Sequence, residues 1–462
     1  MTEVYNKFKN DSVAVSADTG HRARLGYNIG RYDAAVKAGK LQYANLELAK
    51  RRAAFLKNKV IGDLEKFLVE FEVNFEKNGG KIIWAQDASD ALKEIEAIIR
   101  KKEAGYVVKT KSMVSEEIGL NEHLAGIGVE SVETDLGEYI VQTAGEKPYH
   151  IVTPAMHKSK EDVADLFHQK FKLPSGSSPS QIMAFVRNQL RDKFFNAKVG
   201  ITGANFLIAD TGSVCLTENE GNGLMTTAFP DIHIVIAGIE KVIPSIRNLD
   251  LFWPLLATHG TGQKLTAYNS IISGPRQEGE TDGPSEMYVI LLDNSRTQVL
   301  AQKHQRRALA CIRCGACLNA CPVYKTIGGH AYGTTYSGPI GSVITPWMKG
   351  PGEYKHLSDA STLCGACTEV CPVKINLHEL LLYNRNDSVK MGYHTAFDSV
   401  TMFTWKRIML NRKWMDTGTA RLKNFILNKV FAKAWGSRRS LPEVSEKNFR
   451  QLWEERRDGN IS

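Results

Sequence analysis

The sequence predicts an α/β domain with a parallel β-sheet, followed by a mainly helical, cysteine-rich segment and a basic helical C-terminal region. From about residue 80, short apolar strands alternate with amphipathic helices, a pattern typical of a parallel sheet with helices on both faces. Seven of the eight cysteines then fall between residues 311 and 371. With 462 residues, 43% of them hydrophobic and 24% charged, the chain has the length and composition of a globular protein with two or three domains.

Four segments are expected along the chain. The first is helical, because apolar residues recur at helical spacing among many Lys, Arg and Glu residues. It packs on the rest of the chain or contacts a partner. The expected segments are a helical lead-in (1–75), the α/β domain (76–293), the cysteine-rich domain (294–392) and the basic C-terminal region (393–462).

The α/β domain is predicted from its strands and the helices between them. Strands are expected at 81–84, 105–108, 128–132, 150–152, 231–238 and 287–292, with two more between 200 and 223, and helices at 89–100, 116–124 and 160–171. In such a sheet the ligand site lies at the carboxyl ends of the strands. One such end, Lys109 to Glu117, is either an anion site formed by its lysines or a helix start capped by Ser115, and the sequence favours neither.

Further candidate residues lie in the second half of this domain. A long polar loop is expected from His259 to Pro284, and His259 is a ligand or acid–base candidate as well as a plain hydrogen-bonding residue. Cys215 lies between apolar neighbours and is expected to be a buried hydrophobe. No glycine-rich nucleotide-binding motif is present.

Two cysteine motifs dominate the next segment. The first places cysteines at three-residue spacing, followed by a fourth before a proline, and the second repeats the end of this pattern. This spacing is typical of loops that hold [4Fe-4S] clusters, whereas structural zinc sites have no use for three close thiolates followed by Cys-Pro. A disulfide framework would spread the cysteines along the chain. The motifs are Cys311, Cys314, Cys317 and Cys321, and Cys364, Cys367 and Cys371.

The ligand count predicts two interlocked clusters. In two-cluster motifs the last cysteine of each run ligates the other cluster. The first cluster then takes Cys311, Cys314, Cys317 and Cys371, and the second takes Cys321, Cys364 and Cys367. The eighth position falls at Ser361, which leaves a serine ligand, an open corner or a three-iron cluster as alternatives.

The regions around the motifs are predicted from composition. A helix is expected from Ser295 to Ala308, and the glycine- and proline-rich stretch between the motifs is expected to be a loop whose Tyr and Trp residues shield a cluster. Most of the net charge of +9 comes from residues 393–462, which contain fourteen Lys and Arg residues but only seven Asp and Glu residues. This charge suits a solvated face, an acidic partner or an anionic membrane surface better than nucleic acid, for which no motif is present. Without an apolar span or a secretory signal, we expect a cytoplasmic protein.

Several long segments, together with both cysteine motifs, resemble the lactate utilization protein B family. They are Lys109 to Asn121, Glu133 to Ile140 and Gly203 to Phe206. The resemblance implies an N-terminal LUD domain, similar in fold to sugar-phosphate isomerases and coenzyme A transferases, and a ferredoxin-type domain with seven ligand cysteines. Thr217 to Gly221 resembles the transferase motif in which a glutamate is the nucleophile, which would be Glu218, although Glu220 departs from that motif.

The family also implies a function. It implies an iron–sulfur electron carrier that acts with two other lactate-utilization proteins, one cysteine-rich and one with a LUD domain, in the oxidation of a small 2-hydroxy acid, L-lactate, to pyruvate. A different hypothesis makes the LUD domain itself the catalytic unit, acting on a small carboxylate through Glu218 or His259 with the clusters auxiliary. A third makes the clusters structural parts of an assembly scaffold.

Overall fold

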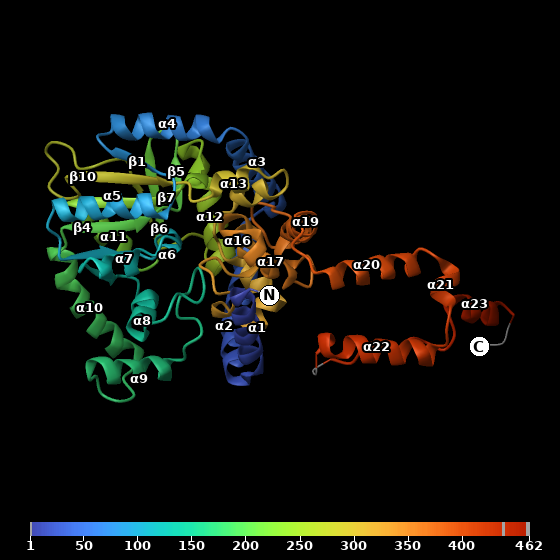
Figure 1. Ribbon diagram of the computed structural model, residues 1–462. Coiled ribbons are helices and arrows are strands. Elements are labelled where there is room, and N and C mark those ends of the chain that lie inside the picture. Colours follow the sequence, from blue (N-terminus) through green and yellow to red (C-terminus); the bar gives the residue numbers. More distant parts are fainter. Residues whose placement is uncertain (1, 437–438, 459–462) are drawn as a thin grey trace. The chain divides into compact units, whose positions relative to one another are not determined.

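The computed structural model describes residues 2–436 and 439–458 and separates into two compact units, one ending at Met391 and the other beginning at Gly392 (Figure 1). Each unit is described by itself. Among the described residues, the helices all lack the combined length and apolar character that a membrane crossing requires.

The helical start of the chain is confirmed, and its packing partners lie within the first unit. It forms α1 (Glu3–Ala17), α2 (Thr19–Gly39), α3 (Leu46–Gly62) and α4 (Leu64–Lys77). Leu25 and Ile29 of α2 join the core of the cysteine-rich segment, whereas Phe71 and Phe75 of α4 pack against the sheets. The lead-in therefore packs against both the α/β domain and the cysteine-rich segment.

The predicted parallel sheet is confirmed. Its six strands lie in the order β1-β10-β7-β4-β2-β3, and every neighbouring pair is parallel. The strands are β1 (Lys81–Ala85), β2 (Tyr106–Lys109), β3 (Glu130–Glu133), β4 (Val199–Gly203), β7 (Ile232–Gly238) and β10 (Glu286–Leu292).

The central strands are buried on both faces, which explains their uninterrupted apolar sequences. In β7, Ile234 and Ile236 face the core of α5 (Ala88–Lys101), while Val235 and Ala237 face α4. Figure 1 shows α4 and α5 running along the sheet in separate layers. Side chains that alternate between two cores fix the strand register, because a shift by one residue would exchange the faces.

A second sheet was not predicted. It has the order β8-β5-β6-β9 and contains antiparallel pairs. Its strands are β5 (Phe206–Ile208), β6 (Ser213–Glu218), β8 (Val242–Ile243) and β9 (Tyr268–Ile272). Cys215 lies fully buried in β6, as expected, and burial raises the pKa of its thiol to about 12.

Three predictions for the α/β domain are corrected by the structure. The expected helix 116–124 is divided into α6 (Met113–Glu117) and α7 (Leu120–Gly126), because Gly119 takes a left-handed φ of 69°. Ser112, not Ser115, caps α6. The expected strand 150–152 is an irregular loop, in which the His150 ring accepts hydrogen bonds from the backbone N–H groups of Val152 and Thr153.

Three further helices, α8 (Leu136–Ala144), α9 (Lys160–Phe171) and α10 (Pro179–Asn196), share a separate apolar core. Figure 1 shows them together at one end of the first unit. Later in the sequence come α11 (Asn222–Ala228) and α12 (Leu249–Thr261). His259 belongs to α12, so the predicted polar loop is wrong at its start, because Gly262 ends the helix with a φ of 79°.

The cysteine-rich segment is more helical than predicted. Instead of one helix from 295 to 308, α13 (Arg296–Ala301) is followed by a 3-10 turn (Gln305–Ala310). The stretch between the motifs, expected to be a loop, forms α15 (Pro322–Ile327), a short 3-10 turn (His330–Tyr332), α16 (Gly338–Lys349) and α17 (Pro351–Asp359). The motifs themselves carry α14 (Ala316–Ala320) and α18 (Ala366–Glu369), and α19 (Leu377–Lys390) follows them.

The second unit contains α20 (Ala396–Met409), α21 (Arg412–Asp416), α22 (Ala420–Trp435) and α23 (Phe449–Arg457). Among its described residues, many large apolar side chains are exposed between the basic ones, including Phe397, Trp405, Trp414 and Trp453. The unit is therefore a set of amphipathic helices with little core of its own.

Candidate functional site

The two cysteine motifs have the same local backbone shape. Arg313 and Gly315 have φ angles of 60° and 78°, and the matching Leu363 and Gly365 have 53° and 82°. A Cβ at Gly315 would also make a tight contact with the 150–152 loop, 3.1 Å from Ile151 Cγ2. Each left-handed turn leads into a short helix, α14 or α18, whose first cysteine is Cys317 or Cys367.

Four cysteines line one apolar cavity, which is formed by both motifs. Cys311, Cys314 and Cys317 come from the first motif and Cys371 from the second, with Leu318 and Ile340 among the apolar lining. Burial, and then the neighbouring thiols of Cys311, Cys314 and Cys371, raise the pKa of Cys317. The last cysteine of the second motif thus joins the cysteines of the first.

The other three motif cysteines form a second group. Burial, followed by Cys321 and Cys364, raises the pKa of Cys367 to about 11. Cys364 is exposed to solvent, whereas Cys367 is buried. Ser361 lies where Cys311 lies in the first motif: its Oγ accepts a hydrogen bond from Leu363 N at 3.1 Å, as Cys311 Sγ accepts one from Arg313 N at 3.4 Å.

Cations surround the first cysteine. Lys57 of α3 and Lys241 are buried, Arg313 is half-buried, and all three interact electrostatically with Cys311. Burial lowers the pKa of Lys57 and of Lys241 to about 8 each, and Glu240 opposes the shift in both. Positive charge is therefore concentrated beside the first cysteine of the first motif.

A buried ion-pair network joins the α/β domain to the first motif. The Arg296 guanidinium donates to Glu117 Oε2 at 2.8 Å and to Glu240 Oε2 at 2.5 Å, and Arg313 Nη2 lies 3.3 Å from Glu240 Oε1. Burial alone would raise the pKa of Glu240, but Arg296 and Arg313 lower it to about 2. Tyr336, from the segment between the motifs, donates to Glu117 and lies under the Arg313 guanidinium.

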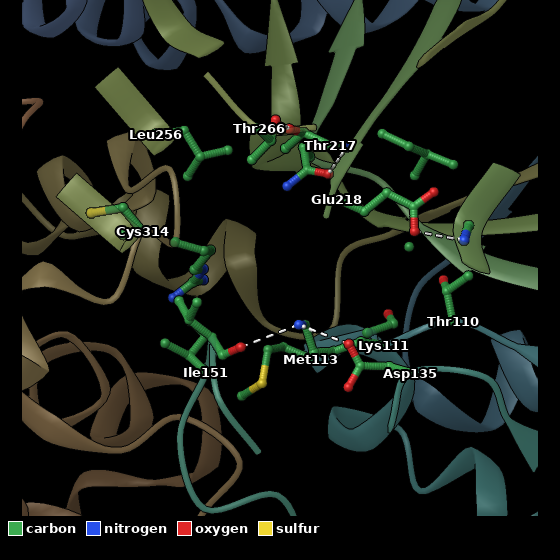
Figure 2. Close-up of a pocket in the computed structure, with 18 of the residues that line it drawn as sticks. Thr110, Lys111, Met113, Asp135, Ile151, Thr217, Glu218, Leu256, Thr266 and Cys314 are labelled. Atoms are coloured by element: carbon green, nitrogen blue, oxygen red, sulfur yellow. Dashed lines mark hydrogen bonds and ion pairs between the residues drawn. The ribbon is translucent and has the colours of Figure 1, made fainter. Parts of the chain in front are cut away.

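A larger cavity of about 360 Å³ lies next to this network (Figure 2). It opens at the carboxyl ends of β2, β4 and β6 and is closed by α12, the 150–152 loop and the first cysteine motif. Figure 2 shows Cys314 and Leu256 on one side of the space and Glu218 and Asp135 on the other. Ile151, Arg313 and Cys314 line both this cavity and the cysteine cavity, so the two share a wall.

Of the candidate residues that the sequence suggested in the α/β domain, some line the large cavity and others lie outside it. Glu218 lines the large cavity, but its carboxylate accepts hydrogen bonds from Gly223 N at 2.7 Å and Leu224 N at 2.8 Å. His259 lies outside the cavity lining and is buried in α12, and burial lowers its pKa to about 4. The lysines expected to bind an anion pair with carboxylates, Lys109 with Glu133 at 2.8 Å and Lys111 with Asp135 at 3.2 Å.

Sequence reasoning missed four residues of the cavity lining: Asp135, Glu220, Lys241 and Arg313. Only two of them had a local signal. Glu220 is the extra acid before Gly221, and Arg313 lies between two cysteines of a motif. Asp135 and Lys241 belong to separate elements far apart in the sequence, and only the fold brings them together.

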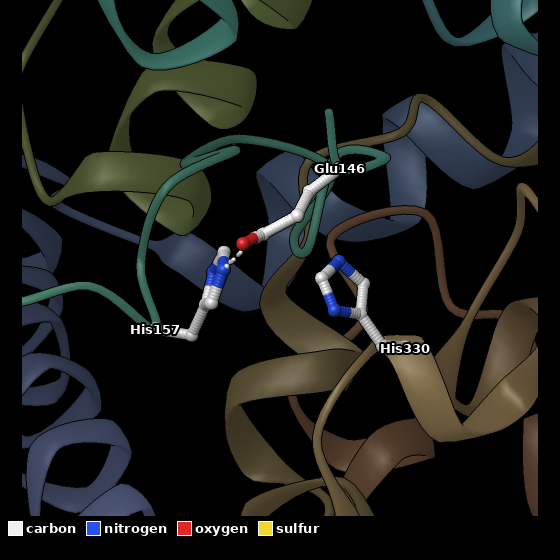
Figure 3. Close-up of side chains that lie close together, drawn as sticks. All are labelled: Glu146, His157 and His330. Carbon is white, nitrogen blue, oxygen red and sulfur yellow. Dashed lines mark hydrogen bonds and ion pairs between the residues drawn. The ribbon is translucent and has the colours of Figure 1, made fainter. Parts of the chain in front are cut away.

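Glu146 and His157, from the loop after α8, form a cluster with His330, from the segment between the two cysteine motifs (Figure 3). One potential ligand atom from each lies within 4.8 Å of the others. The Glu146 carboxylate is held by His157 Nε2 and by Lys158 Nζ, each at 2.6 Å, and the Tyr149 ring stacks on His157. Because a lysine already neutralises the carboxylate, the cluster is better explained as a tether between the loop after α8 and the segment between the motifs.

Comparison with known proteins identifies both domains. Residues 68–292 match the LUD domain and residues 307–375 match the 4Fe-4S dicluster domain. The chain is 40% identical over 415 residues to lactate utilization protein B from Bacillus thuringiensis (strain Al Hakam), Bacillus cereus (strain AH187) and Bacillus anthracis (strain CDC 684 / NRRL 3495). Each match covers 87% of this chain and 87% of the relative.

The chain belongs to the lactate utilization protein B family. Its fold class is that of a LUD domain followed by an iron–sulfur domain, as expected from the sequence. A solved structure of a DUF162 family protein from Deinococcus radiodurans is also similar, with 14% identity and a TM-score of 0.28, over 50% of this chain and 98% of that one.

The cysteine cavity fits the iron–sulfur cofactor that the family match supports. Four thiol groups converge on an apolar cavity, and backbone N–H groups donate to sulfur at Cys311 and at Cys371, the latter from Ile375 N at 3.4 Å. Soft thiolate ligands, an apolar shell and amide donors to sulfur are the features that iron–sulfur sites require.

The buried network gives a first prediction. Replacing Arg296 by Met leaves Glu117 and Glu240 buried with less compensation, so we expect a loss of about 3–5 kcal/mol of unfolding free energy. Arg100→Met is the matched control, because it breaks only the exposed pair with Glu96 and is expected to cost less than about 0.5 kcal/mol. Urea unfolding of the anaerobically purified chain measures both, and equal midpoints for the two variants would contradict the importance of the network.

Proposed function

We propose that the chain is an iron–sulfur electron-transfer component of a bacterial lactate-oxidation system. It acts there with two other lactate-utilization proteins, one cysteine-rich and one with a LUD domain. Iron–sulfur clusters, when bound, exchange electrons one at a time, and two of them per chain can accept the electron pair from a two-electron oxidation. The observation that carries this proposal is the division of the seven motif cysteines into two interlocked groups.

The proposed ligands follow the two groups. Cys311, Cys314, Cys317 and Cys371 hold the first cluster, and Cys321, Cys364 and Cys367 hold the second. Support comes from the shared cavity of the first group and, for the second, from the contribution of Cys364 to the raised pKa of Cys321 and of both to that of Cys367. Position 361 supplies the eighth corner, because Ser361 has the place and the hydrogen bond that Cys311 has in the first motif.

The surroundings of the first group suit a redox site. Tyr324 and Tyr332 are almost fully buried and shield it from water, and Lys57, Lys241 and Arg313 bring positive charge to Cys311. Positive charge favours the reduced, more negative form of a cluster. The second group is nearer to solvent, since Cys364 is exposed, which makes it the better point of exchange with another protein.

The alternative, in which the LUD domain is catalytic through Glu218 or His259, has less support in the contacts of those residues. Glu218 caps the start of α11, and His259 is buried away from the cavity. The exposed apolar and basic side chains of the second unit supply a surface for a partner protein, as an electron-transfer component needs.

The interlocked assignment predicts which cysteines act together. Cys371→Ala is expected to remove the same EPR signal as Cys317→Ala, although the two residues lie in different motifs, and each variant is expected to lose roughly four iron atoms per chain. Cys321→Ala and Cys367→Ala are expected to remove the other signal. Cys215→Ala, which changes a thiol outside both groups, is the control. Pairing of Cys371 with Cys367 instead would refute the assignment.

The eighth corner is tested by two changes at one position. Ser361→Cys supplies a thiolate where the first motif has Cys311, so the Mössbauer spectrum of the second cluster alone is expected to change. Ser361→Ala separates a serine ligand from an open corner or a three-iron cluster, because only a serine ligand is lost in that variant. A spectrum of the first cluster that changed with Ser361→Cys would place position 361 elsewhere.

The electron-transfer role is tested with the whole system. With both partner proteins and L-lactate under anaerobic conditions, we expect reduction of an artificial dye to require this chain. Activity is expected to fall to background with Cys317→Ala and to be retained with Cys215→Ala. Full dye reduction without the chain, or with Cys317→Ala, would rule out the proposed function.

A further inference from the structure

Two cations that line the large cavity, Lys241 and Arg313, have polar atoms without a hydrogen-bond partner. Lys241 is 9% exposed, and the described part of the chain gives its Nζ neither a hydrogen bond nor an ion pair. Arg313 Nη1 is buried without a hydrogen-bond partner, and only Nη2 reaches Glu240. An unpaired Lys241 ammonium and an unsatisfied Arg313 N–H group at one cavity leave a charge and a donor that an anionic ligand can satisfy.

The opposite side of the cavity has a different character. Asp135, Glu218 and Glu220 line it, and burial together with the Asp135 carboxylate raises the pKa of Glu220. Glu220 Oε2 accepts a hydrogen bond from Leu136 N at 3.3 Å, and these carboxylates can accept a further one from a ligand hydroxyl. Thr110, Asn205 and Thr217 add uncharged polar groups, whereas Met113 and Leu256 give an apolar wall.

This polarity selects among anions. A dianion such as phosphate would meet three acidic side chains and three cations, of which Lys111 is already paired with Asp135. A monocarboxylate with a neutral oxygen substituent suits both sides, because its charge can lie near Lys241 and Arg313 and its hydroxyl or oxo group near the acids. A short hydrocarbon part would contact Met113 or Leu256.

We propose that this cavity is a binding site for a small hydroxy- or oxocarboxylate, whose carboxylate is held by Lys241 and Arg313. The bound molecule lies against the wall that the cavity shares with the cysteine cavity, since Arg313 and Cys314 line both. The proposal that the molecule binds here depends only on the residues that line the cavity. That this position sets the ligand beside a redox group rests on the proposed function.

The test is calorimetric titration of the full chain, purified anaerobically with its iron. L-Lactate and pyruvate are expected to bind saturably, and L-lactamide, in which a neutral amide replaces the carboxylate, at least tenfold more weakly. Inorganic phosphate is expected to bind no better than lactamide. Absent binding of both acids, equal binding of lactamide, or tighter binding of phosphate would each overturn the proposal without any variant being made.

The variants locate the site. Lys241→Met is expected to weaken lactate binding at least tenfold and Lys241→Arg to retain most of it, because the charge is kept. Lys93→Met, on the exposed face of α5, is the matched control and is expected to have no effect. Unchanged affinity in Lys241→Met would overturn the site. Iron content and the visible spectrum are measured in each variant to detect loss of the cofactor.

The outcomes also separate this inference from the proposed function. Lactate binding that depends on Lys241, together with lactate-dependent dye reduction that does not need the chain, would leave the site standing and remove the electron-transfer role. Dye reduction that needs the chain, with no lactate binding to it, would remove the site and leave the role. The LUD domain would then serve only to hold the iron–sulfur segment.

Discussion

The ion pairs that Arg296 forms with Glu117 and Glu240 hold together the parts from which both cavities are built. Glu117 follows a strand of the parallel sheet, Glu240 follows another, and Arg296 begins the segment that leads into the first cysteine motif. Buried ion pairs seldom add much stability, but they are intolerant of a missing partner and so fix geometry. Because Arg313 shares Glu240 with Arg296, the shape of the first cysteine loop depends on the same charges.

The elements that the sequence predicted are those whose determinants are local. The strands of the parallel sheet stand out because both of their faces are buried, so their apolar sequences are nearly continuous. The local shape of the cysteine motifs also follows from the sequence, since Arg313-Cys314-Gly315 and Leu363-Cys364-Gly365 take the same backbone turn. The place of Ser361 also follows from that repeat.

What the sequence could not predict depends on packing between distant segments. Glycine and proline residues between the motifs indicated a loop. However, Pro339 and Pro351 lie in the first turns of helices, where a missing N–H is harmless. Gly341 allows α16 to pack closely against Tyr336, because a Cβ there would lie 1.9 Å from the Tyr336 backbone oxygen. His259 was assigned to a loop because of Gly262, which instead ends its helix. Nothing local distinguishes Lys241, a buried cation, from the many solvated lysines of the chain.

The shared wall between the two cavities gives the LUD domain a place in the chemistry that neither domain has alone. The carboxyl ends of its strands form a polar pocket, as parallel sheets generally do, but the far side of that pocket is the first cysteine loop. Lys241 and Arg313 face the pocket and also act on Cys311. Charge gained by the cysteine group therefore weakens the hold of the same two cations on an anion in the pocket, and an anion bound there makes that group harder to reduce. The proposed anion site and the proposed iron–sulfur site therefore share the same two cations, so occupancy of one is expected to affect the other.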